Sequence, residues 1–163
     1  MNRSIRNTTL GCFVGVLSLA GMMALAQDRP GRLMMQEAPL DKVVTIPREE
    51  LVGLFRRANQ ENLGVIRMLE GGEYNVNIRH FENVTPENFS MLTHPDTIDL
   101  WIVQEGSGTM ITNAERVNDR YVGGEERFIS VGDMVFVPAG MSHGIKETRS
   151  LTFFNIRWPE HRN

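Results

Sequence analysis

The chain has 163 residues, a length typical of one domain. Its formal net charge is −3, and no basic stripe stands out, which argues against a nucleic-acid partner. The only cysteine, Cys12, excludes an internal disulfide and lies in a segment that we expect to be removed. The remaining domain is therefore predicted to have no thiol nucleophile and no cysteine-based zinc site.

Residues 1–26 predict a secretory signal peptide. Arg3 and Arg6 form a short basic region, the stretch 10–25 is apolar, and Ala24-Leu25-Ala26 is a small-residue cleavage signature. The alternative is an uncleaved membrane anchor, but the apolar stretch is shorter than the roughly 20 residues that a span needs. We expect a secreted, periplasmic protein without stable membrane insertion after cleavage.

The rest of the chain is predicted to be a short arm followed by one domain. The segment 27–46 contains Pro and Gly and has no clean period, which favours an extended N-terminal arm. The domain spans 47–163 and opens with a helix at 47–59, where Pro47 suits the first helical position. Apolar side chains recur there at helical spacing, at Leu51, Leu54, Phe55 and Ala58.

After the helix, the chain has the pattern of short strands separated by Gly and Pro. Strands are predicted at 65–69, 74–80, 99–103, 109–112, 128–129, 134–137 and 150–158. The Gly-rich segment 105–108 predicts a hairpin turn, and the polar segment 118–126 predicts a loop. Many short strands at close spacing predict an antiparallel sandwich or barrel.

One segment combines turn residues and a histidine at a distinctive spacing. Gly132, Pro138, Gly140 and His143 follow the pattern G-x5-P-x-G-x2-H. Glycine tolerates positive φ and proline lacks a ladder donor, so these residues turn the chain at both ends of a short strand. The segment resembles the second conserved motif of the cupin superfamily, although Glu147 stands where the family usually has asparagine.

The resemblance extends to part of the first cupin motif, G-x5-H-x-H-x3,4-E-x6-G. Counted back from Gly106, Asp99 stands in the place of the glutamate, and His94 stands at the second histidine position. Leu92 occupies the first histidine position, so one ligand of the family pattern is lost. The resemblance implies an all-β fold, a cupin-type antiparallel jelly-roll β-barrel with one N-terminal helix and its functional site inside the barrel.

In metal-binding cupins, the residues at these positions converge on one divalent ion. The resemblance therefore implies His94, Asp99 and His143 as metal ligands. Two imidazoles and one carboxylate suit Fe, Mn, Ni or Zn, with open positions for substrate or water. His80 is a candidate to replace the missing ligand. His94 could instead belong to a surface loop, because Pro95-Asp96 favours a turn.

Asp99 stands at the start of an apolar predicted strand. A lone charge on an apolar strand is costly, so Asp99 needs a partner. That partner is a metal, His143, Arg79 or Lys146. The residues expected around the pocket, some of which could instead be plain core, are His80, Leu92, Trp101, Met134 and Phe136.

The fold alone does not determine the function, because cupin barrels include enzymes, storage proteins and sensors. We predict a divalent-metal-dependent enzyme that acts on a small organic molecule inside the barrel, as an oxygenase, isomerase, lyase or hydrolase. The alternative is a non-catalytic periplasmic protein that binds a small ligand. A third class is a structural module that dimerises through the arm and the helix, and a homodimer is left open.

Overall fold

The computed structural model describes residues 32–35, 41–71 and 74–160, so the predicted signal peptide lies outside the described residues. The elements are, in chain order, β1 (Arg32–Met34), α1 (Arg48–Gln60), β2 (Val65–Gly71), β3 (Tyr74–Val84), β4 (Thr97–Thr112), β5 (Glu115–Val117), β6 (Arg120–Val122), β7 (Glu125–Ser130), β8 (Met134–Val137) and β9 (His143–Pro159). Within these ranges, no helix is both long and apolar enough to cross a bilayer.

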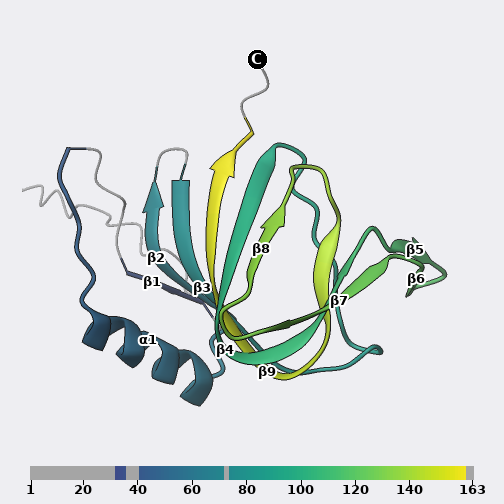
Figure 1. Ribbon diagram of the computed structural model, residues 1–163, viewed down its shortest axis with the longest axis horizontal. Coiled ribbons are helices and arrows are strands. Elements are labelled where there is room, and N and C mark those ends of the chain that lie inside the picture. Colours follow the sequence, from purple (N-terminus) through teal and green to yellow (C-terminus); the bar gives the residue numbers. More distant parts are fainter. Residues whose placement is uncertain (1–31, 36–40, 72–73, 161–163) are drawn as a thin grey trace, which may run out of the picture.

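Seven of the strands form one curled sheet. Its order is β1-β2-β3-β9-β4-β7, and β8 pairs with the part of β4 that β7 leaves unpaired. The pairs are antiparallel except that β1 runs parallel to β2. The long strands β4 and β9 lie together at the centre, and the sheet curls around them into a barrel-like cup (Figure 1). The prediction of a mostly antiparallel barrel with one N-terminal helix is confirmed.

The hairpin predicted at 105–108 is wrong, because β4 continues through this segment. The pairing of β4 with β9 shifts register on both sides of Gly106. Gly106 has a φ of +74°, and a Cβ there would lie 2.0 Å from the carbonyl oxygen of Ser150 on β9. The glycine thus permits a bulge at which β4 changes neighbours. Its first half pairs with β8, and its second half pairs with β7.

Two segments that were predicted to lack strands contain short ones. In the predicted loop 118–126, Asn118 and Asp119 have φ values of +48° and +63° and join β5 to β6 as a tight hairpin. Asn and Asp tolerate this left-handed geometry, which two-residue hairpin turns require. In the predicted arm 27–46, β1 adds a short parallel strand to the edge of β2.

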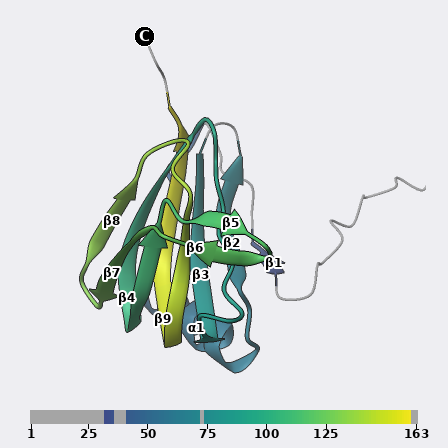
Figure 2. The same ribbon diagram turned by 90° about the vertical axis from the view of Figure 1, so that its right-hand side faces the viewer.

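The outer face of the sheet is covered by α1 at β2 and β3 (Figure 1, Figure 2). The helix has acidic residues in its first turn and Arg57 in its last, as the helix dipole favours. Its buried side meets the sheet in an apolar layer, the helix cluster. The buried members of the helix cluster are Leu54, Phe55, Ala58, Ile66, Met68 and Ile78.

The inner face of the sheet forms the core of the barrel. The members of this barrel cluster are Trp101, Val103, Met110, Ile129, Val137, Ile145, Leu151 and Phe153. Side chains alternate between the two faces along a strand, so Phe153 packs in the barrel while Phe154 contacts Phe55 of α1. The barrel cluster leaves one end of the interior to polar residues, and the candidate site lies there.

Candidate metal centre

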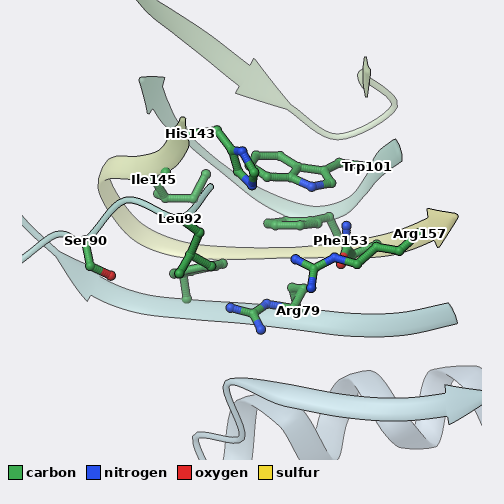
Figure 3. A pocket seen from close by; sticks show the side chains of 11 residues that line it. Arg79, Ser90, Leu92, Trp101, His143, Ile145, Phe153 and Arg157 are labelled. Carbon is green, nitrogen blue, oxygen red and sulfur yellow. The ribbon is translucent and has the colours of Figure 1, made fainter. Parts of the chain in front are cut away.

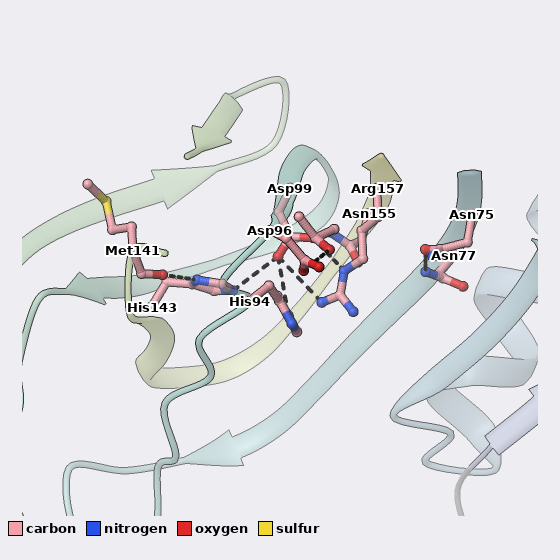
Figure 4. A network of polar contacts seen from close by, with 10 residues as sticks. Asn75, Asn77, His94, Asp96, Asp99, Met141, His143, Asn155 and Arg157 are labelled. Carbon is pink, nitrogen blue, oxygen red and sulfur yellow. Dashed lines mark hydrogen bonds and ion pairs between the residues drawn. The ribbon is translucent and has the colours of Figure 1, made fainter. Parts of the chain in front are cut away.

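The structure brings His94, Asp99 and His143 together at the polar end of the barrel interior (Figure 4). Asp99 lies near the start of β4 and has no exposed surface. His143 is the first residue of β9 and is also buried, whereas His94 lies in the segment before β4 and is half-buried. The potential ligand atoms of the three side chains all lie within 4.8 Å of one another.

The separations suit ligands of a shared ion. Oδ2 of Asp99 lies 3.1 Å from Nε2 of His143 and 3.7 Å from Nε2 of His94. Two ligand atoms that each lie about 2.1 Å from an ion are about 3.0 Å apart at a right angle and about 3.4 Å apart at the tetrahedral angle. The three side chains are therefore close enough to bind one ion with little rearrangement.

Backbone hydrogen bonds join the two segments that supply the histidines. Leu92 and His143 each donate a backbone N–H to the other's carbonyl, at 2.8 and 2.9 Å. Gly140, which has a φ of +80°, donates its N–H to the carbonyl of His94 at 2.7 Å. The turn formed by Pro138 and Gly140 thus positions both histidines, and His94 is not a free surface-loop residue.

The ring of His143 has a defined orientation. Its Nδ1 lies 2.9 Å from the backbone oxygen of Met141, which can only accept a hydrogen bond. Nδ1 therefore carries a proton, and Nε2 faces Asp99. Without a proton on Nε2, this nitrogen and the carboxylate oxygen are both acceptors, so a proton or a cation between them makes the contact favourable.

Asp99 is held in its ionised form by a network of donors. Burial alone raises the pKa of Asp99, but the hydrogen bond with His143, the charge of Arg157 and the amide of Asn155 together lower it below its ordinary value of 3.8. Nε of Arg157 donates to Oδ1, and Nη2 lies 3.4 Å from Oδ2. Nδ2 of Asn155 donates to Oδ1 at 3.2 Å.

The sequence had suggested Lys146 or Arg79 as the cationic partner of Asp99. Lys146 instead pairs with Glu126 of β7. The cation that binds Asp99 is Arg157, which lies directly opposite Asp99 in the β4–β9 ladder. The alternation of β9 places Arg157 and Asn155 on the same face as the buried Phe153, and that pattern was the available signal for both residues.

His94 has the properties of an available ligand. Burial lowers the pKa of His94 below its ordinary value of 6.5, the charge of Arg157 lowers it further, and Asp99 opposes this shift. The ring is therefore neutral at pH 7. Its Nε2 is buried and has no hydrogen-bond partner among the described residues. A neutral imidazole with an unpaired nitrogen fits a divalent ion, which binds only deprotonated ligands.

A cavity of about 50 Å³ adjoins the centre (Figure 3). Leu92 and Trp101, both expected around the pocket, line it together with His143. The indole of Trp101 meets the His143 ring edge-on, with ring centroids 5.5 Å apart. Arg79 of β3 and Arg157 of β9 also line the cavity, so it combines apolar walls with cationic side chains.

Three residues expected near the pocket do not line this cavity. Met134 and Phe136 are 69% and 57% exposed, because Val135 and Val137 take the inward positions of β8. His80 is buried on the helix side of β3, where its Nδ1 lies 2.9 Å from the hydroxyl of Thr152. His80 therefore does not supply the histidine ligand that is missing at position 92.

The antiparallel topology and the turn of Pro138 and Gly140 before β9 agree with the fold that the sequence resemblance implied. No model of a protein family matches the chain, and no curated protein matches it.

Several solved structures are similar to the chain at low sequence identity. The Bacillus halodurans protein BH2720 is 16% identical over 77% of this chain and 88% of its own, with a TM-score of 0.49. Fe(II)-HppE with an alternative substrate is 16% identical over 53% of this chain and 43% of its own, with a TM-score of 0.44. The DMSP lyase DddQ of Ruegeria pomeroyi is 15% identical over 56% of this chain and 40% of its own, with a TM-score of 0.42. The chain thus spans less than half the length of the latter two proteins.

Proposed function

We propose that the protein is a divalent-metal-dependent enzyme that acts on a small organic molecule inside the barrel. The observation that carries this proposal is the convergence of His94, Asp99 and His143 within 4.8 Å, beside a cavity. Two imidazoles and one carboxylate form a donor set typical of Fe(II), and Mn, Ni and Zn also accept it. An ion held there would supply Lewis acidity, which polarises a substrate oxygen or activates water or O2.

The surrounding residues prepare the ligands for this role. The carbonyl of Met141 fixes the tautomer of His143, so the ring can bind a cation only through Nε2. Arg157 and Asn155 orient the carboxylate of Asp99 and hold it ionised. Trp101 and Phe153, whose ring centroids lie 4.6 Å apart, form apolar walls of the cavity.

A second candidate function is non-catalytic binding of a small ligand. The observation that favours it is that Arg157 contacts both carboxylate oxygens of Asp99. This pair neutralises the charge of Asp99 within the chain itself. In that case Nε2 of His143 and the cationic side chains of the cavity would hold the ligand directly.

Metal analysis separates these two functions. We expect the purified full chain, incubated with Fe(II), Mn, Ni or Zn and then desalted, to retain about one ion per chain. His143→Ala should weaken metal binding by at least about 10- to 100-fold, the loss that follows removal of even an outer-shell partner. His80→Gln is the matched control, because His80 is also buried but lies outside the site. Equal metal retention in both variants, or none in the wild-type chain, would favour the ligand-binding function.

We also propose that the protein is exported to the periplasm. The support is the pattern of basic, apolar and small residues in the segment 1–26. N-terminal sequencing of the protein from its native host should begin at Gln27. An intact Met1 on membrane-bound protein would contradict the proposal.

A further inference from the structure

The outer face of the sheet is covered by α1 only in part. The helix contacts β2 and β3, and its Phe55 reaches Phe154 of β9. In Figure 1 and Figure 2, α1 lies away from β8. The outer face of β8, of the first half of β4 and of the end of β9 is therefore left without the helix.

This uncovered part of the outer face is apolar. Two rows of paired residues cross β8, β4 and β9, namely Phe136–Leu100–Ile156 and Met134–Ile102–Phe154. Residues that are paired across an antiparallel ladder point to the same face of the sheet, and the contact of Phe154 with Phe55 identifies this face as the outer one. Trp158 follows on the same face of β9, with its ring centroid 6.5 Å from that of Phe136.

We define the β8 face by six of these residues. They are Leu100, Ile102, Met134, Phe136, Ile156 and Trp158. None of the six is charged, and Met134 and Phe136 are 69% and 57% exposed. Phe128 of β7, which is 70% exposed, lines a cleft together with Met134 and Phe136 and so extends the face. An apolar patch of this kind, depleted of charge, marks an interaction surface.

The size of the β8 face fits a dimer. An interface of standard size buries about 800 Å² on each partner, of which about 55–65% is apolar, or about 500 Å². A large apolar side chain contributes about 150–250 Å², so at their exposed fractions the β8 face and Phe128 together offer roughly 500 Å². A two-fold axis places the same face on both partners, so the two areas match by symmetry.

The surface also has both a projection and a recess. Phe128 and Phe136 stand exposed at a cleft of about 580 Å³ between β7 and β8, and Met110 and Met141 line the same cleft. Methionine side chains adapt their shape to an inserted group. A copy that is turned about a two-fold axis can insert an aromatic ring into the cleft of its partner and receive one in return. Such an exchange closes at two chains.

We propose that the protein forms a homodimer in which the β8 face of one copy packs against the β8 face of a second copy about a two-fold axis. Apolar sheet faces pack in this way, at about 10 Å from each other, within β-sandwiches. The proposal does not depend on a metal ion, because the β8 face lies on the side of the sheet opposite to Asp99. It also differs from dimerisation through the arm and the helix.

Sedimentation of the protein, expressed with its full sequence, tests the proposal. Across micromolar concentrations, we expect the wild type to have the mass of two chains. Phe136→Lys should weaken the dimer by about 30-fold or more, the effect of losing a central apolar residue of an interface. Phe136→Leu should weaken it less, because the side chain stays apolar. Val122→Lys is the matched control, since Val122 is 48% exposed but belongs to the separate sheet of β5 and β6, and it should stay dimeric.

Stability measurements show that loss of the dimer is not loss of the fold. The circular dichroism spectrum of Phe136→Lys should equal that of the wild type, because the side chain is more than half exposed. The denaturation midpoint should rise with protein concentration for the wild type and for Val122→Lys, and stay constant for Phe136→Lys, because association stabilises by mass action.

Three results would overturn the proposal. The first is a wild type with the mass of one chain at every concentration. The second is a dimer that Phe136→Lys leaves intact, which would place the interface on another part of the chain. The third is a monomer that binds phosphatidylcholine vesicles and loses this binding in Phe136→Lys, which would assign the β8 face to a lipid surface.

Discussion

The two faces of β9 have different chemistry. On the outer face, Phe154 packs against Phe55 of α1, and the helix cluster around them is apolar. On the inner face, Phe153 packs in the barrel cluster, and the next inward residues, Asn155 and Arg157, bind the buried Asp99. The outer face is apolar where the helix packs on it, whereas the inner face ends in a charged network.

This difference has a functional meaning, because the two faces contribute differently to stability. Apolar burial of the kind in the helix cluster stabilises a fold directly. A buried ion pair is weak evidence for stability, since desolvation offsets most of its Coulombic energy. The pair of Asp99 and Arg157, together with two histidines, is therefore better explained by binding than by folding.

Removing the buried carboxylate should have the largest effect. Asp99→Ala leaves Arg157 and His143 without their partner in a buried position, which should lower the free energy of unfolding by about 3–5 kcal/mol. Metal binding should also be lost. Chemical denaturation of the metal-free protein and metal titration measure the two effects. Asp96→Ala, an exposed aspartate three residues earlier, is the control and should change stability by less than about 0.5 kcal/mol.

A change on the outer face should affect stability only. Ile66 is fully buried in the helix cluster, and Ile66→Ala should lower the free energy of unfolding by about 2–4 kcal/mol through the cavity it leaves. Its metal affinity should equal that of the wild type, measured at a temperature where both proteins are folded. A matching loss of metal affinity would show that the two faces are not independent.

The bulge of β4 should be sensitive to a single methyl group. Gly106→Ala places a Cβ against the carbonyl oxygen of Ser150 and imposes a positive φ on alanine, which should cost about 1–3 kcal/mol of stability. Thermal denaturation measures this effect. Gly53→Ala on α1 is the control, because nothing lies within 4 Å of its added Cβ, and it should stabilise the helix by up to about 1 kcal/mol. Equal melting temperatures for the two variants would contradict the bulge.

The smallest expected effect is a pH dependence on the outer face. Burial lowers the pKa of His80 below its ordinary value of 6.5, and the charges of Glu82 and Glu105 oppose this shift only in part. Below pH 6.5 the unfolded chain therefore binds a proton at His80 that the folded chain does not. The contribution of His80 to the free energy of unfolding should be constant above that pH and should fall as the pH decreases below it.

The variant His80→Gln isolates this contribution, because it keeps a polar group opposite Thr152 and cannot titrate. Between pH 5 and 6.5, the stability of the wild type should fall more steeply than that of the variant, by the equivalent of at most one proton. Denaturation midpoints measured from pH 5 to 8 give both slopes. Parallel curves would mean that His80 is protonated equally in the folded and unfolded states.

Local sequence patterns determined much of the fold and part of the site. The apolar period of 47–59 predicted α1 within one residue at each end, because a helix depends on neighbours three and four positions apart. The turn residues Pro138 and Gly140 placed His143 at the start of β9, since proline and glycine constrain the backbone locally. The candidate ligand positions came from a motif spacing, which is also a local property.

The pairing of distant strands was decided only by the tertiary structure. Asp99 and Arg157 are opposite each other because β4 and β9 adopt one register over segments 58 residues apart. A slip of one residue would turn every side chain to the other face, and no local signal specifies that alignment. The same reason explains why Met134 and Phe136 face outward and why β4 bends at Gly106 without a hairpin. These outcomes depend on which strands are neighbours, and that is a property of the whole sheet.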